Sequence, residues 1–170
     1  MISKLHHFFY VALILFCLSA SAAQTGKIPF QGTVVEAGIF EAVGSGACSA
    51  APDTAAGRTC DLYEIRLVES NRNVKAELGV TFGFRYRLDG VPYGEIEDLE
   101  MRAIHPSMKG SDGIARDRST APAHAFGRNG RADDFIVYTL SEPFEVVLGQ
   151  WHLQLLHKGR VVISQEFILQ

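Results

Sequence analysis

The sequence predicts an all-β fold, an antiparallel β-sandwich, and two stretches carry most of that prediction. Residues 78–88 (LGVTFGFRYRL) alternate apolar side chains with glycine, threonine or arginine along their whole length. Residues 151–169 repeat this alternation in two runs, which include the only tryptophan, Trp151. Because strand side chains point to opposite faces in turn, both stretches are typical of strands that are buried on one face. No helix could gather such residues on one side.

The last stretch is expected to form a hairpin that places a large aromatic side chain between two sheets. Its first run puts Trp151, Leu153 and Leu155 on one face. Gly159, in the intervening His-Lys-Gly-Arg segment, can supply the positive φ of a tight turn. The second run, residues 161–169, has a shared apolar face with one polar exception, Gln165; its apolar members are Val161, Ile163, Phe167 and Leu169.

The remaining elements follow from shorter patterns between turn signals. Gly38 permits a bulge or close packing in the first strand, and an isolated helical turn is an alternative near Glu95 to Met101. Residues 44–59 are rich in small residues and are expected to form a surface loop, and residues 106–129 a long polar loop. About seven short strands separated by turns favour an immunoglobulin-like sandwich. The predicted strands before the hairpin are 33–43, 61–70, 78–88, 95–105 and 133–140.

The first 23 residues have the layout of a cleaved signal peptide. Lys4 precedes a short apolar core, and a run of small residues ends at Ala23. We expect cleavage after Ala23, with Ala22 next, and one domain over residues 24–170. A retained anchor is the alternative, but the apolar core is shorter than the roughly 20 residues that span a bilayer. The prediction is a periplasmic or secreted protein with no membrane span after cleavage.

Two cysteines remain after that cleavage, Cys48 and Cys60. In an oxidising compartment they are expected to form a structural disulfide. A reactive thiol or a two-cysteine metal site is the alternative, but no histidine lies near them in the sequence.

The net charge of the chain gives no electrostatic argument for the binding of nucleic acid. The formal net charge is −3, and loss of the signal peptide, with one lysine and no acid, makes it −4. Basic residues gather only between Lys109 and Arg131. This segment is the best candidate for a contact surface, although a solvated loop is the simpler interpretation. The candidates are Lys109, Arg116, Arg118, Arg128 and Arg131.

Three segments resemble a bacterial family of small exported domains known as domain of unknown function 3859. They are GIFEA at 38–42, LGVTFGFRYRLDG at 78–90 and the stretch from Glu142 to Leu169. The resemblance covers about residues 33–169 and implies an exported β-rich domain. It implies no activity, ligand or catalytic residue, and the Cys48–Cys60 segment lies outside the family pattern.

No catalytic, metal-binding or cofactor-binding motif is present. The sequence has no Gly-x-Ser-x-Gly elbow, no phosphate-binding glycine loop and no His-x-x-x-His pair. The four histidines beyond the signal peptide are expected on the surface, with His152 on a polar strand face and His157 in a turn. The leading hypothesis is therefore a non-enzymatic exported domain, without a cofactor, that binds a protein or a cell-envelope component. The alternative is a hydrolase-like enzyme whose site is formed by His105, His124 and the acidic residues of the long loop.

Overall fold

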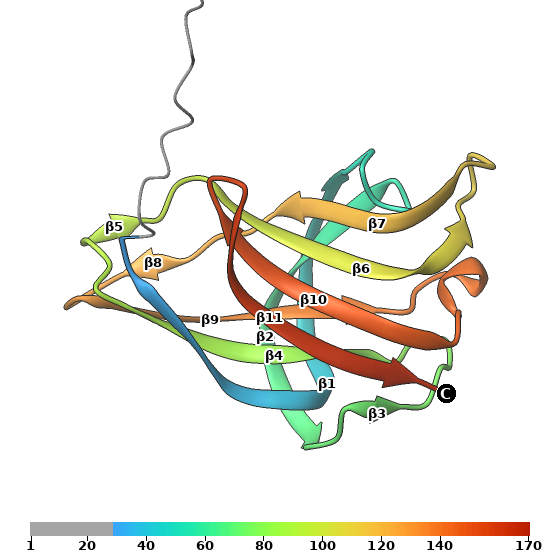
Figure 1. Cartoon of the computed structure of the whole chain (residues 1–170), viewed down its shortest axis with the longest axis horizontal. Helices are drawn as coiled ribbons and strands as arrows, with labels where there is room; N and C mark the ends of the chain where they lie inside the picture. Colours follow the sequence, from blue (N-terminus) through green and yellow to red (C-terminus); the bar gives the residue numbers. More distant parts are fainter. Residues whose placement is uncertain (1–28) are drawn as a thin grey trace, which may run out of the picture.

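The structure, a computed structural model, describes residues 29–170 (Figure 1). The predicted signal peptide lies outside these residues. Two sheets pack face to face. The first sheet has the strand order β2-β1-β4-β9 and the second β3-β11-β10-β6-β7. Every pair is antiparallel except β3 with β11. The strands of the first sheet are β1 (Gln31–Ala50), β2 (Arg58–Glu69), β4 (Thr81–Asp89) and β9 (Arg131–Thr139). Those of the second are β3 (Asn73–Val74), β6 (Leu99–Lys109), β7 (Ala115–Pro122), β10 (Gly149–His157) and β11 (Arg160–Leu169).

Three short elements complete the described chain. β5 (Gly94–Glu95) pairs with β8 (Phe126–Gly127), and a single 3-10 turn, η1 (Pro143–Glu145), precedes β10. The described residues contain no α-helix, so the helical alternative near Glu95 is wrong. The all-β sandwich is confirmed. It has more strands than the seven expected because β7 and the two-residue strands β3, β5 and β8 were not predicted, and β5 and β8 form a small sheet of their own.

The strand β4 lies inside the first sheet, as its alternation predicts. Phe82, Phe84, Tyr86 and Leu88 are buried against the second sheet. On the opposite face, the arginines of the same strand form ion pairs with neighbouring strands: Arg85 with Glu36 at 3.4 Å and Arg87 with Asp133 at 3.0 Å. This separation of apolar and charged faces fixes the register of β4, because a shift of one residue would bury the arginines.

The β10–β11 hairpin supplies the aromatic centre of the core, as expected. The Trp151 ring packs edge to face on Phe82, with centroids 5.5 Å apart, and on Tyr138 at 5.0 Å. Lys158 and Gly159 both have positive φ, at 51° and 73°, which is the backbone of a tight hairpin turn. Val161 is 43% exposed, so its predicted place on the buried face is wrong. The register shifts beside its partner Leu156, and this bulge turns the start of β11 outward.

Both predicted loops contain strands. β1 continues to Ala50, and β2 begins at Arg58, so only residues 51–57 connect them. Residues 106–129 hold the end of β6, all of β7 and β8. Neither segment has the composition of a strand, but each pairs with a well-formed neighbour, and cross-strand pairing outweighs weak intrinsic preference. Gly38 provides the predicted close approach, since a Cβ there would lie 2.0 Å from the carbonyl oxygen of Glu69.

Candidate binding pocket beneath the β1–β2 arm

The outer halves of β1 and β2 form an arm, in which the two strands pair only with each other because the pairing of β1 with β4 ends at Phe40. We define the arm as residues 41–64, including the connecting residues 51–57. Cys48 and Cys60 are direct cross-strand partners and form a disulfide, with Cα atoms 4.0 Å apart. The predicted disulfide is therefore confirmed. It joins the two strands close to the tip, where most of the arm's side chains are exposed and apolar packing is sparse.

The tip of the arm contacts the second sheet. The backbone N–H of Thr120, on β7, donates to the carbonyl oxygen of Asp53 at 3.1 Å. Ala51 and Ala55 are the buried residues of the tip, at 6% and 3% exposure. In Figure 1 the tip reaches the level of β7. Because β7 is the last strand of its sheet, this contact also covers part of an edge that would otherwise be open.

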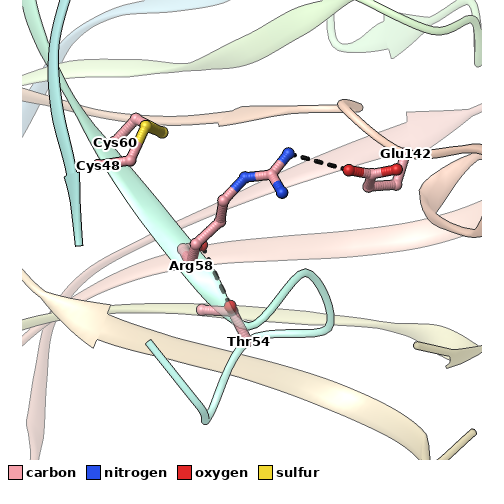
Figure 2. The surroundings of a disulfide bond; sticks show 5 residues. All are labelled: Cys48, Thr54, Arg58, Cys60 and Glu142. Atoms are coloured by element: carbon pink, nitrogen blue, oxygen red, sulfur yellow. Dashed lines mark hydrogen bonds and ion pairs between the residues drawn. A yellow bond between two sulfur atoms is a disulfide. The ribbon is translucent and has the colours of Figure 1, made fainter. Parts of the chain in front are cut away.

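A second link joins the base of the tip to the turn before β10. The guanidinium of Arg58 donates to the carboxylate of Glu142 at 2.9 Å (Figure 2). The Thr54 hydroxyl donates to the Ala51 carbonyl oxygen at 2.8 Å, and the Arg58 carbonyl oxygen lies 3.2 Å from the same hydroxyl. The arm is thus held at both sides, by β7 and by η1, and it spans the space between them.

A pocket of about 610 Å³ lies between the arm and the body of the sandwich. This volume is in the range of about 300–1,000 Å³ that is common for small-molecule sites. Its walls come from both sheets, which distinguishes it from a surface groove on one sheet. The apolar lining residues are Phe40, Leu62, Met101, Val137 and the alanines Ala42, Ala56 and Ala121.

Glu145, from η1, is the main buried charge of the pocket wall, with 2% of its surface exposed. Its carboxylate accepts hydrogen bonds from the Tyr138 hydroxyl at 2.8 Å and from the Ser141 hydroxyl at 2.9 Å. The backbone N–H groups of Ser141 and Glu142 donate to it as well, each at 2.8 Å. Burial, with the Glu145 charge beside it, raises the pKa of Tyr138 well above its usual value. Four donors therefore compensate one buried carboxylate, and it holds η1 against β9.

A histidine and a serine form a second buried pair at the pocket. The Nε2 atom of His105 lies 3.2 Å from the hydroxyl of Ser119, a lining residue. The Nδ1 atom lies 3.0 Å from the Pro106 carbonyl oxygen, so Nδ1 carries the proton and Ser119 donates to Nε2. Burial lowers the pKa of His105, so the ring is neutral at pH 7. Ser119 is only 1% exposed, so its hydroxyl is buried in this structure.

The structure separates the histidines that the enzyme alternative brings together. His105 is buried and packs on Trp151 at 4.9 Å, whereas His124 is exposed and pairs with Glu95 at 3.0 Å. Only His105 contacts a pocket residue. The surface placement expected for His105 and His157 is wrong, because both are buried. His157 ends β10 with its ring 4.9 Å from Phe30, and burial lowers its pKa.

The five basic candidates lie in two groups at opposite ends of the sandwich (Figure 1). One group flanks the β6–β7 turn and the other flanks the β8–β9 turn. Two of the five have ionic partners: Arg116 with Asp112 at 2.6 Å, and Arg131 with Asp89 at 3.6 Å. Hydrogen bonds from Arg116 hold the pKa of Asp112 at about 2. None of the five lines the pocket. The first group is Lys109, Arg116 and Arg118, and the second is Arg128 and Arg131.

Within residues 29–170, no three histidine, cysteine, aspartate or glutamate side chains gather as a metal site would require. The same residues include no helix of the length and hydropathy needed to cross a membrane. The pocket residues escaped sequence analysis because they come from separate strands and follow no motif. The small-residue stretch 44–59 was the one available signal, and it was interpreted as a loop.

Comparisons with known proteins agree with this architecture. Residues 30–169 match the family model described as "Domain of unknown function (DUF3859)". The crystal structure of an immunoglobulin-like protein from Pseudomonas aeruginosa is similar, with a TM-score of 0.56 and 23% sequence identity. The similarity covers 82% of this chain and 97% of that one, and it shows the immunoglobulin-like fold. A comparison with curated proteins found no match.

Proposed function

This chain belongs to the family of domain of unknown function 3859, and we propose a function for it. It is an exported, non-enzymatic module that binds a cell-envelope component in the pocket beneath the arm. The observation that carries the proposal is the pocket itself. It is concave, both sheets line it, and a disulfide-joined arm forms one of its walls. A disulfide also suits the oxidising compartment to which an exported protein is delivered.

The polar groups of the pocket support binding in preference to catalysis. Glu145 has four donors, and the His105–Ser119 pair is buried. A nucleophile or general base must reach the substrate within hydrogen-bond distance. The polar atoms of these groups are instead hydrogen-bonded to other groups of the protein.

Export and binding are tested separately. Fractionation of cells, followed by mass measurement of the mature protein, should place it outside the cytoplasm with Gln24 as its first residue. For binding, the purified mature protein is incubated with envelope extract, recovered, and analysed by mass spectrometry for retained molecules. The same is done with Ala42→Trp, which narrows the pocket, and with Ala47→Trp, at another exposed position of β1 outside the lining.

A molecule retained by the wild type and by Ala47→Trp, but not by Ala42→Trp, is the expected result. Equal retention by all three proteins, or no retention, would contradict pocket binding. A protein partner is a separate outcome. It would be recognised by loss of capture in the double variant Lys109→Glu/Arg118→Glu, which reverses two exposed charges at the β6–β7 end, while Arg128→Glu at the other end retains it.

The hydrolase alternative is tested with Ser119→Ala and an activated ester. We expect no turnover above the rate in buffer for either the wild type or the variant. Turnover that disappears in Ser119→Ala would assign catalysis to the His105–Ser119 pair.

A further inference from the structure

The charged side chains of the pocket already have partners inside the protein. Arg58 pairs with Glu142, Glu41 pairs with Arg66, and Glu145 accepts four hydrogen bonds. A charged ligand would therefore lose part of its hydration and would have to compete with these partners for a counter-charge. An uncharged ligand has no such cost.

Most hydroxyl groups of the pocket are satisfied as well. Thr81 and Thr139 bond to each other at 2.8 Å, and Ser119 bonds to His105 at 3.2 Å. Hydroxyl groups that are already hydrogen-bonded to each other offer few free donors or acceptors to a ligand. The pocket wall therefore acts as a mainly apolar surface.

We propose that the pocket binds an uncharged, mainly apolar small molecule. This rests on the proposed function and specifies its ligand class. The apolar part contacts the walls formed by Leu62, Met101 and Val137. Selection against charge follows from the pairing of Arg58, the one cation among the lining residues, with Glu142, because an acidic head group would have to compete with that carboxylate.

Two fluorescent probes with the same aromatic body test the selection against charge. N-phenyl-1-naphthylamine is neutral, and 8-anilinonaphthalene-1-sulfonate adds one sulfonate. We expect the neutral probe to bind the mature protein at least about tenfold more tightly, because burial of an unpaired charge is costly. Decanol should displace the neutral probe more effectively than decanoate. Tighter binding of the sulfonate, or stronger displacement by decanoate, would overturn the proposal.

A pair of charge-introducing variants tests the location. Leu62→Asp places a carboxylate in the apolar wall and should weaken the neutral probe at least about tenfold. Val68→Asp makes a comparable change at an exposed position of the same strand outside the lining and should leave binding unchanged. If Leu62→Asp fails to fold, Ala42→Trp compared with Ala47→Trp gives the same test. Equal affinity in a variant and its control would place the probe elsewhere and refute the assignment.

The proposed function and the ligand class can fail separately. A charged envelope molecule retained in a pocket-dependent manner would support the function and overturn the uncharged ligand class.

Discussion

Two buried tyrosines give opposite predictions for the same chemical change. The hydroxyl of Tyr138 donates to the buried carboxylate of Glu145 at 2.8 Å. The hydroxyl of Tyr86 is also buried but has no hydrogen-bond partner among the described residues. Burial raises the pKa of both phenols far above the usual value, so both are neutral hydroxyls at pH 7. Replacement by phenylalanine removes one oxygen from each site and leaves the ring in place.

Tyr138→Phe is expected to destabilise the protein and Tyr86→Phe is not. A hydrogen bond to a charged acceptor contributes about 2 kcal/mol, so Tyr138→Phe should lower Tm by about 6 °C. In Tyr86→Phe, the loss of an unsatisfied buried hydroxyl should leave the stability unchanged or increase it by up to about 1 kcal/mol. Urea and thermal unfolding of the two variants and the wild type measure both values. A loss of more than about 1 kcal/mol in Tyr86→Phe, or losses of equal size in both variants, would refute the reasoning.

Three further predictions concern the arm, the buried histidines and the packing of β4. The double variant Cys48→Ser/Cys60→Ser removes a disulfide that joins residues 12 positions apart, which should lower the free energy of unfolding by up to about 3 kcal/mol. Urea unfolding of the wild type in the presence of a reductant should show the same loss. Burial lowers the folded-state pKa of His105 and of His157 below 6.5, so the unfolded chain binds more protons than the folded protein at acid pH. The stability that these neutral rings provide is therefore fully present above about pH 6.5 and falls as the pH is lowered. The double variant His105→Gln/His157→Gln should flatten the decline of the unfolding free energy between about pH 7 and 5. Gly83→Ala should cost about 1–3 kcal/mol, because a Cβ there would lie 2.1 Å from the backbone oxygen of Ile136, and an unchanged Tm would show that β4 and β9 can separate without penalty.

The sequence was sufficient to predict structure wherever the residues of one segment determine its conformation by themselves. Phe82, Phe84 and Tyr86 are buried together because they alternate with other residues, so only a strand places all three rings on one face. The Lys158-Gly159 turn was predictable for the same local reason, since the turn's backbone requirement acts on the residues that form it. The Cys48–Cys60 pair needed only a count of cysteines and a compartment.

Features that depend on partners distant in the sequence could not be predicted. Glu145 is buried because Tyr138, Ser141 and the Glu142 N–H gather around it, and the sequence PFEVV gives no indication of those donors. His105 is buried because the apolar face of β6 points inward at its position, although histidine alone is compatible with a surface. The burial of such side chains is decided by the arrangement of the strands and not by the residue type.

The composition that led residues 44–59 to be interpreted as a loop also explains why the structure has a pocket there. Elsewhere, large side chains such as Phe82 and Trp151 fill the space between the sheets. Beneath the arm, the lining includes Ala42, Ala56 and Thr59, whose small side chains leave space unfilled. An arm of small residues gains little from apolar burial, so covalent linkage of Cys48 to Cys60 supplies stability that packing does not. Small side chains and a disulfide are thus two parts of one arrangement: the first opens the pocket, and the second keeps its cover in place.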